Sequence, residues 1–501
     1  MKLRTGSAGT DQVPGPLRGI VPMLLLTLLV LALAVPAGLI IAPAFLGHNA
    51  SAEPVASAPP WQQPPAALAA RSGAGIEPLS AAAPVPEPGT LAAQLNETLK
   101  TDGAGTFTGV VQDAATGKLL FDRSADKVRV PASNMKLLTA SAALRTLGPD
   151  RRFSTRVLAG SAPGTVILAG GGDVLLGAGD SAPEAVLGHA GLATLAQSTV
   201  RALQADGVSG TVTVLLDDSL FTGPSLNPAW SAEDVAAGEM APLFPLALNS
   251  ARFDPAKTTG PRPQDAAMTA AEAFWAQLSA AGAPAGLTVA PGVVRAPAGS
   301  AEEAGSAGSA GEAKVLAEVQ SATVGQQVDL LLRTSDNYLT EVMGRMTALA
   351  VGKPASNDGA AAAVLQQLGE LDVDTATLRA ADVSGLALAN RVSARQLAEV
   401  VRAITSGTDT RLRAALAGFP VAGLTGTLGD RYTDASTARG AGLVRAKTGT
   451  LNTVIALSGY VVDADGRLLV FSFIGNGLAP GAANKTALDR TASVLAGCGC
   501  R

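Results

Sequence analysis

An apolar stretch without a charged side chain lies near the N-terminus of the chain. Residues 20–46 carry no charge, whereas residues 1–19 contain Lys2, Arg4 and Arg18. At about 1.5 Å per residue, a helix over this stretch is long enough to cross the roughly 30 Å apolar layer of a membrane. The basic residues before it predict a cytoplasmic N-terminus, with the rest of the chain on the outer side.

The fate of this apolar segment stays open at the level of sequence. Its length favours a transmembrane anchor. Ala42–Ala44 and Ala50–Ala52, by contrast, have the small-x-small form of a signal-peptide cleavage site. Both alternatives place the remaining chain in the cell envelope, outside the cytoplasm.

Two stretches show neither helical nor strand periodicity. Residues 47–89 are rich in Ala, Pro and Ser, with paired prolines at 59–60 and 64–65, which is typical of an extended, semi-rigid linker. Residues 298–313 alternate Gly, Ser, Ala and Glu, which predicts a disordered surface loop. The linker would hold a folded region, beginning near residue 90, away from the membrane.

Elsewhere, the apolar residues recur with periods typical of strands and of helices. Residues 106–112 and 118–121 are two strand-like runs ahead of an apolar helix that runs from Ser133 to about Leu147. The other expected strands are 166–168, 211–216, 286–290, 442–448, 454–462 and 467–474. The other expected helices carry apolar stripes within 91–99, 271–278, 339–346, 397–404 and 488–495, and a capping box at Ser393 and Gln396 opens one of them. This mixture indicates an α+β protein.

Composition narrows the possible chemistry. A net charge of −4 and a pI of about 5.4 argue against a nucleic-acid partner. Of the two histidines, only His189 is a plausible member of a Ser-His-Asp triad, and Cys498 and Cys500 cannot complete a four-ligand zinc site. No metal or organic cofactor is therefore implied. The two cysteines either form a small disulfide or are free thiols on a frayed tail.

The start of the helix after the first two strands carries a candidate nucleophile. Ser133 and Lys136 are three residues apart, so they share one face of a helix. A lysine amine can take the proton of a serine hydroxyl only if burial or another cation lowers its pKa from about 10.4. We therefore expect a second cation nearby. The Ser-x-x-Lys pattern alone is weak, because it recurs by chance in long chains.

Two later motifs strengthen this interpretation. The Ser-Asp-Asn motif at 335–337 and the Lys-Thr-Gly motif at 447–449 follow in the order typical of penicillin-binding proteins and class A β-lactamases. Each motif alone is weak, but the ordered triple is a strong signal.

The chain resembles the D-alanyl-D-alanine carboxypeptidase/endopeptidase family, the class C low-molecular-mass penicillin-binding proteins of peptidase family S13. The resemblance covers roughly residues 90–500. It rests on the stretches Val130–Ala140, Ser335–Asn337, Asp382–Arg391, Gly426–Leu428 and Val444–Leu451. It implies a β-lactamase/transpeptidase-like domain, an antiparallel sheet flanked by helices, with domains inserted between the first two motifs. Class A β-lactamases lack that insertion.

On this resemblance we expect residues 90–155 and 322–501 to form the catalytic domain. Residues 156–321 would form the inserted domain or domains, including the loop at 298–313. The resemblance further implies a serine-type D-Ala-D-Ala carboxypeptidase or endopeptidase. Its substrates would be peptidoglycan stem peptides ending in D-Ala-D-Ala, and β-lactam antibiotics would inhibit it.

The resemblance also implies a role for each motif residue. Ser133 would be the nucleophile and Lys136 its base. Ser335 would relay a proton to the leaving amine, and Asn337 would bind the substrate backbone and steady Lys136. Lys447 would lower the pKa of Lys136 and attract the substrate's terminal carboxylate.

The strand that carries Lys-Thr-Gly would align the substrate along its edge. Thr448 would contact the terminal carboxylate. The backbone N–H groups of Ser133 and Thr450 would form the oxyanion hole. Gly449 would avoid crowding the substrate.

Several alternatives remain open. A β-lactamase would share the three motifs, although we identify no glutamate suited to activating a deacylating water. A non-catalytic wall-binding scaffold would keep the fold without turnover. Asp336 is equally consistent with bracing its loop, and Asp382, Ser384 and Gly385 with forming a turn. The run Gly170–Asp173 predicts a turn rather than a phosphate-binding loop.

Overall fold

The structure is a computed structural model that describes residues 79–80, 82–297, 314–479 and 481–500, all within the unit Pro78–Arg501. The expected membrane segment at 20–46, the larger part of the expected linker and the expected loop at 298–313 lie outside the described residues. Among the helices of the described residues, none is long and apolar enough to cross a membrane.

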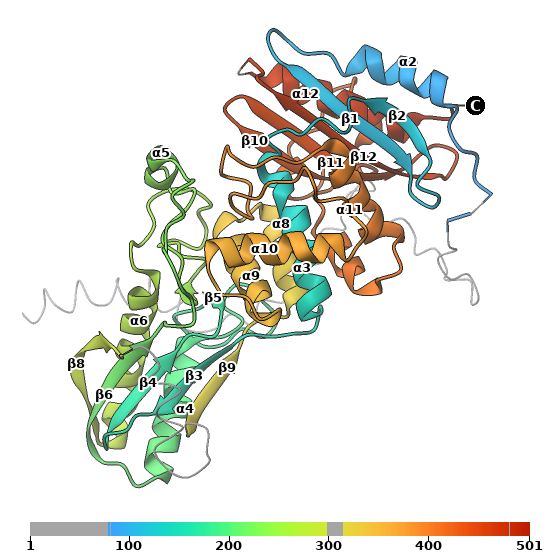
Figure 1. Ribbon diagram of the computed structural model, residues 1–501. Coiled ribbons are helices and arrows are strands. Elements are labelled where there is room, and N and C mark those ends of the chain that lie inside the picture. The colour runs from blue at the N-terminus through green and yellow to red at the C-terminus, as the bar shows by residue number, and fades with distance from the viewer. Residues whose placement is uncertain (1–78, 81, 298–313, 480, 501) are drawn as a thin grey trace, which may run out of the picture. The chain divides into compact units, whose positions relative to one another are not determined.

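A five-stranded antiparallel sheet with the order β10-β11-β12-β1-β2 joins the two ends of the described chain (Figure 1). In the ladder between β1 (Thr106–Asp113) and β12 (Leu468–Asn476), Phe107 pairs with Gly475. Its strands are β1 (Thr106–Asp113), β2 (Leu119–Arg123), β10 (Arg445–Leu451), β11 (Val454–Val462) and β12 (Leu468–Asn476). Because β10 is an edge strand, one side of its backbone is not used by the sheet.

Both faces of this sheet are buried, because successive side chains of a strand point to opposite faces. Val110 and Val470 lie in one hydrophobic core, and their neighbours Val111 and Phe471 lie in another. Helices α2 (Pro88–Thr98) and α12 (Ala482–Gly497) contribute to the second core. The first core contains residues of α3 (Met135–Leu147), α8 (Val324–Thr334), α9 (Asn337–Ala350), α10 (Asn357–Gly369) and α11 (Ala394–Ser406).

Several helix starts follow directly from local sequence. Ser393 and Gln396 form the expected capping box at α11, and Thr323 with Gln326 forms a second one at α8 that the sequence analysis did not identify. The expected strand at 442–448 begins only at Arg445, because the preceding residues form a turn in which the Leu443 N–H donates to the Gly440 carbonyl.

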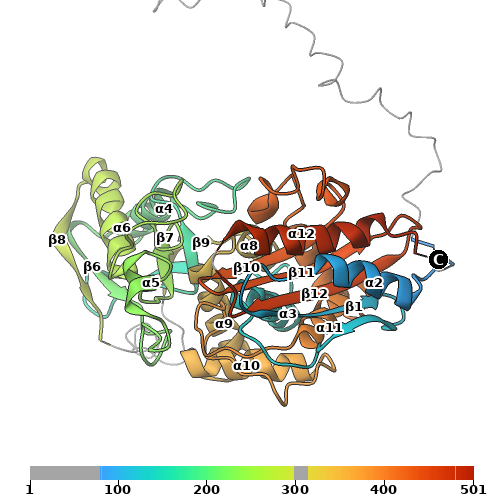
Figure 2. The ribbon, with the colours of Figure 1, turned by 90° about the horizontal axis from the view of Figure 1, so that it is seen from above.

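A second part of the structure spans residues 154–320 and is called the insert below. Its five-stranded sheet has the order β8-β6-β4-β3-β9, in which β4, β6 and β8 run parallel. The strands are β3 (Ser154–Ala159), β4 (Thr165–Ala169), β6 (Gly210–Asp217), β8 (Leu287–Arg295) and β9 (Val315–Gln320). Helices α4 (Leu192–Ala205) and α6 (Ala266–Gly282) share a hydrophobic core with this sheet (Figure 2).

The insert contains further short elements. Strands β5 (Asp173–Leu176) and β7 (Leu246–Leu248) pair in parallel, and α5 (Ala232–Ala236) lies between β6 and β7 in the chain. The glycines before Asp173 connect β4 to β5, so this run is a connection between strands, as expected. The sequence analysis did not identify β3, β5, β7 or β9.

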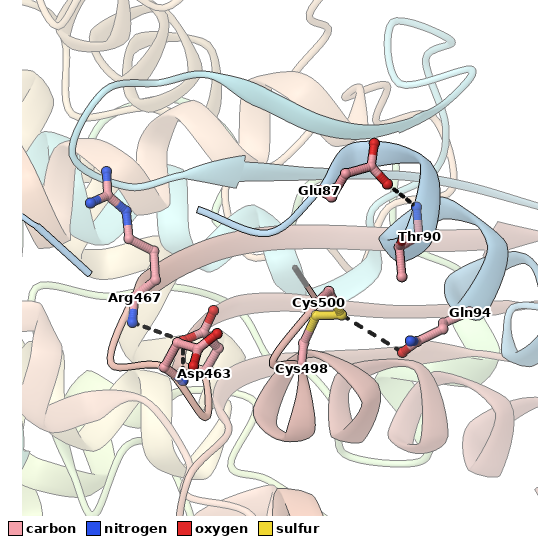
Figure 3. The surroundings of a disulfide bond; sticks show 8 residues. Glu87, Thr90, Gln94, Asp463, Arg467, Cys498 and Cys500 are labelled. Carbon is pink, nitrogen blue, oxygen red and sulfur yellow. Dashed lines mark hydrogen bonds between the residues drawn. A yellow bond between two sulfur atoms is a disulfide. The ribbon is translucent and has the colours of Figure 1, made fainter. Parts of the chain in front are cut away.

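The two cysteines form a disulfide whose halves are buried, so the alternative of free thiols on a frayed tail is wrong (Figure 3). The backbone N–H of Glu87 donates to the carbonyl of Cys500 at 2.7 Å, and the Glu87 carboxylate caps α2. Ala83 is also buried and accepts a hydrogen bond from Arg467. The folded part therefore includes residues 83–89, which composition alone had placed in the linker.

Candidate active site

Ser133 lies on a short 3₁₀ turn, η1 (Ala132–Asn134), that leads into α3. The side chain of Asn476, at the end of β12, bonds both backbone groups of Val130, at 2.9 and 3.0 Å. Ala132 then adopts the left-handed region with φ 48°, which non-glycine residues rarely do. This turn leaves the Ser133 side chain partly exposed, while the helix after it is buried.

Lys136 is fully buried, and its ammonium group is the centre of the hydrogen bonds around Ser133. Its Nζ lies 3.0 Å from Ser133 Oγ, 2.6 Å from Asn337 Oδ1 and 2.7 Å from the Ser384 carbonyl. Burial lowers the pKa of Lys136 from 10.5 to about 8, although nearby carboxylates, Asp382 foremost, oppose this shift. A substantial neutral fraction near pH 8 makes Lys136 chemically able to accept the Ser133 proton.

Lys447 is the second buried amine and lies on the edge strand β10. Its Nζ donates to Ser335 Oγ at 3.0 Å and to the Thr448 carbonyl at 2.8 Å. Burial holds the pKa of Lys447 well below its usual value, and the positive charge of Lys136 lowers it further. The structure thus brings together Ser133, Lys136 and Asn337 as one hydrogen-bonded group, and Ser335 with Lys447 as another.

The Ser-Asp-Asn motif is the junction between two helices. Ser335 ends α8 in the left-handed region, with φ 60° and ψ 38°, and Asn337 is the first residue of α9. Asp336, between them, caps α9 by accepting the Leu339 N–H at 3.0 Å. This sharp junction points the first and third side chains of the motif toward Lys447 and Lys136 respectively.

Among the described residues, no strand of the sheet covers the outer edge of β10, and alternate backbone N–H groups of β10 face this edge. The Ala446 N–H donates to the Pro420 carbonyl, outside the sheet, rather than to β11. Because N–H groups alternate along a strand, those of Thr448 and Thr450 face the same outer edge. An extended peptide can therefore add to this edge, and the Thr450 N–H is available as an oxyanion donor.

Gly449 allows close packing within the protein itself. A Cβ at this position would lie 2.9 Å from the Pro131 carbonyl oxygen and 3.2 Å from the Ser133 N. The sequence analysis attributed this glycine to space for a substrate. That interpretation was incomplete, because the contact that requires glycine is the approach of β10 to the turn that carries Ser133.

The Asp382–Gly385 loop also belongs to the site. Asp382 accepts hydrogen bonds from the Gly385 and Ala387 N–H groups and from Asn390, at 2.7–2.8 Å. A Cβ on Gly385, which has φ +91°, would lie 2.0 Å from the Ala132 carbonyl oxygen. This loop therefore packs directly against the Ser133 turn and presents the Ser384 carbonyl to Lys136.

The sequence analysis gave no role to three other polar groups at this site, although one of them, Thr427, lies within the stretch Gly426–Leu428 that it quoted. Glu341 Oε1 accepts the N–H groups of Val383 and Ser384, at 3.0 and 2.8 Å. Thr427 Oγ1 lies 2.7 Å from Thr448 Oγ1, and the Glu239 carbonyl accepts from Asn337 at 3.1 Å. The spacing of four residues after Asn337, one helical turn, was a signal that could have identified Glu341. No local pattern marked Glu239.

No cluster of three or more His, Cys, Asp or Glu side chains in the described part of the chain is arranged to hold a metal ion. The groups that converge on Ser133 are instead amines, hydroxyls, amides and backbone carbonyls. Such a set can activate a serine and bind an acyl group without a cofactor.

The family model of the D-Ala-D-Ala carboxypeptidase 3 (S13) family matches residues 91–290 and 300–497. The chain therefore belongs to this S13 family. Carboxypeptidase DacB of Mycolicibacterium smegmatis is 36% identical over 456 residues, which cover 90% of this chain and 92% of that protein. A D-alanyl-D-alanine carboxypeptidase of an Actinomadura species is 31% identical over 440 residues, covering 74% and 78%.

Solved structures support the fold expected of an S13 protein. Penicillin-binding protein 4 from Haemophilus influenzae is similar with a TM-score of 0.60 and 19% sequence identity, covering 80% of this chain and 97% of that one. The same protein in complex with a β-lactam gives a TM-score of 0.55. The α+β, transpeptidase-like fold expected from the sequence is thereby confirmed.

Proposed function

We propose that this S13 family member is a serine-type D-Ala-D-Ala carboxypeptidase whose nucleophile is Ser133. The observation that carries the proposal is the buried amine of Lys136, 3.0 Å from Ser133 Oγ, with a pKa lowered to about 8. A surface lysine would be protonated at neutral pH and could not act as a base. The substrates would be peptidoglycan stem peptides that end in D-Ala-D-Ala.

In the acylation step, Ser133 Oγ attacks the carbonyl carbon between the two D-alanines while its proton moves to Lys136 Nζ. The oxygen that becomes negative would accept from the N–H groups of Ser133 and Thr450. When the C–N bond breaks, the leaving amine needs a proton, and Ser335 would supply its own while it takes one from the amine of Lys447, which donates to it. The products are free D-alanine and an ester on Ser133.

The same groups would hold the substrate in place. Its backbone would lie along the outer edge of β10, where the Thr448 and Thr450 N–H groups face. Its terminal carboxylate would lie near the amine of Lys447 and the hydroxyl of Thr448. Asn337, which holds Lys136 through its Oδ1, would bind the substrate backbone on the other side.

Deacylation would follow by attack of a water on the ester, after Lys136 has lost the Ser133 proton to solvent. The neutral amine would take a proton from the water and return it to Ser133 Oγ when the ester C–O bond breaks. β-Lactams would acylate the same serine, because their strained amide occupies the position of the scissile bond. The β-lactam complex of the Haemophilus protein supports this extension, since that protein shares the fold.

We further propose a location in the cell envelope, with an N-terminal transmembrane helix over residues 20–46 or a signal peptide that is removed. The supporting observation is the uncharged stretch preceded by basic residues. The proline-rich residues that follow would place the catalytic part at a distance from the membrane.

Release of D-alanine from a synthetic peptide ending in D-Ala-D-Ala tests the proposed reaction. We expect release by the unmodified chain, and a loss of roughly 10²–10⁴-fold in Lys136→Ala, the range typical of a removed general base. Lys118→Ala, which changes an exposed lysine, is the control. Equal release by both variants would contradict the assignment of Lys136.

A further inference from the structure

The insert reaches the catalytic centre through the carboxylate of Asp336. This side chain is 3% exposed, and both of its oxygens are bound. Oδ1 accepts from the Leu339 N–H of its own helix and from Ser250 Oγ of the insert, each at 3.0 Å. Oδ2 pairs with Arg252 of the insert at 2.8 Å. The middle residue of the Ser-Asp-Asn motif is therefore held partly by a distant segment of the chain.

The insert segment that makes these contacts has an unusual backbone. Asn249, Ser250 and Ala251 have φ values of 53°, 56° and 54°, three consecutive non-glycine residues in the left-handed region. Such residues persist only where the surroundings hold them, and they gather at functional sites. Here the Asn249 and Ser250 N–H groups donate to carbonyls of β5, at 3.1 and 2.7 Å. The tight turn directs Ser250 Oγ and Arg252 toward Asp336.

Arg262 connects this turn to a second contact with the motif. It is buried, and it donates to the Ser250 carbonyl at 2.7 Å and to the Gly238 carbonyl at 2.5 Å. The next carbonyl, that of Glu239, accepts from the side chain of Asn337 at 3.1 Å. Because Asn337 Oδ1 holds Lys136, the insert supports both Asp336 and the residue that follows it in the motif.

The same contacts place the positive charges of Arg252 and Arg262 near the negative charge of Asp336. Burial alone would raise the pKa of Asp336, but Arg252 and Arg262, together with the hydrogen bonds from Leu339 and Ser250, hold that pKa below its usual value. The negative charge of Asp336 raises the pKa of Lys136. The other charged or titratable groups around Lys136 are Lys447 of β10, Glu341 of α9, Asp382 of its loop and Glu239 of the insert.

We propose that Arg252 and Arg262 are positioning residues of the active site, through which the insert fixes the Ser335–Asn337 turn and offsets the charge of Asp336. This inference rests on the proposed acylation of Ser133. It gives the insert a part in the reaction: the segment 238–262 completes the surroundings of Lys136. A capping role alone would require only the Asp336 carboxylate, not the two arginines.

The test measures the rate at which benzylpenicillin acylates the full-length chain between pH 6 and pH 10. In Arg252→Met, the charge of Asp336 is offset by Arg262 alone and should raise the pKa of Lys136 further, so the rising limb of the pH profile should move to higher pH. A shift of one pH unit lowers the rate at pH 7 about tenfold. Arg252→Lys, which keeps the cation, should restore most of the profile.

Arg156→Met is the matched control. Arg156 also forms an ion pair in the insert, with Glu318 at 3.0 Å, but its side chain is 51% exposed. This substitution should leave both rate and profile unchanged. A folded Arg252→Met chain with the parent profile would overturn the inference while leaving the proposed function intact, whereas an unmodified chain that is not acylated would contradict the proposed function itself.

If Arg252→Met does not fold, Arg252→Gln keeps a hydrogen-bond donor near Asp336 and removes only the charge. This variant should also move the rising limb of the pH profile to higher pH. A folded Arg252→Gln chain with the parent profile would then overturn the inference. Thermal unfolding of each variant establishes that the chains compared are folded.

Discussion

At the scale of single residues, the environment of Lys136 determines the chemistry. The sequence predicted both the residue and the need for a lowered pKa, because a protonated amine cannot accept a proton. It left two causes open, burial or a second cation, and assigned Lys447 as that cation. Burial is the main cause, and the Ser384 and Asn337 oxygens around the amine become neighbours only through tertiary folding.

The lowered pKa of Lys136 predicts how the acylation rate depends on pH. If neutral Lys136 is the base, the acylation rate constant should rise about tenfold per pH unit below pH 8 and level off above it, since the neutral fraction increases as pH rises through the pKa. Rates with benzylpenicillin at constant ionic strength measure this profile. A rise that continues to pH 10 would indicate that the pKa of Lys136 is not lowered.

A second prediction concerns Glu341. Burial, assisted by the charge of Asp382, raises the pKa of Glu341 to about 8, so this side chain is protonated at pH 7. Glu341→Gln should then acylate at nearly the parent rate at pH 7, because an amide oxygen can still accept the two N–H groups. Glu341→Ala should lose about 1–3 kcal/mol of stability for each buried donor left unpaired.

Thermal unfolding and acylation of both Glu341 variants provide the measurement. Equal losses in the two variants would mean that the carboxylate charge of Glu341, rather than its hydrogen bonds, supports the site.

At the scale of elements, long periodic segments were predictable and short ones were not. Helix α11 has a clear apolar stripe and a capping box at its start, and α3 is a long, mostly apolar run whose residues Met135–Leu144 are all buried. Strands β5 and β7 have four and three residues, too few to show a period. The loop at Asp382 was recognised as a motif, but its contact with Ala132 depends on the tertiary fold.

That contact gives a prediction for Gly385→Ala. The new Cβ would meet the Ala132 carbonyl, and the backbone φ of +91° is unfavourable for alanine. Strain and overpacking should together lower the free energy of unfolding by roughly 2–6 kcal/mol, and acylation should fall because the Ser133 turn is displaced.

Gly369→Ala is the control for this substitution. A Cβ at Gly369 would meet nothing within 4 Å, and the residue ends a helix in an ordinary conformation. Denaturant unfolding should show no loss of stability there. Equal stability of the two variants would argue against close packing of the loop on the Ser133 turn.

At the scale of the whole molecule, the active site is assembled from segments that lie far apart in the sequence. The sequence predicted the family and the transpeptidase-like fold, because the ordered motifs carry that information. It could not predict that the insert contacts Asp336, since Ser250 and Arg252 belong to no motif. The state of the C-terminal cysteines also depended on burial between α12 and α2, which composition does not reveal.

The disulfide should stabilise the protein without affecting the reaction. A loop this short contributes only about 1–2 kcal/mol by loop-closure entropy. Replacing both Cys498 and Cys500 by Ala should therefore lower the melting temperature by a few degrees and leave acylation unchanged. A reducing agent should lower the melting temperature of the parent but not that of the double variant. A loss of acylation in the folded double variant would contradict this prediction.

The central claim, that Ser133 forms an acyl-enzyme, is tested most directly by intact mass over time after mixing the full-length chain with benzylpenicillin, beside Ser133→Ala. We predict a long-lived adduct of one penicillin on the unmodified chain and none on the variant. A short-lived adduct with the drug consumed would instead indicate a β-lactamase. No adduct and no loss of drug would contradict the account and favour a scaffold without turnover.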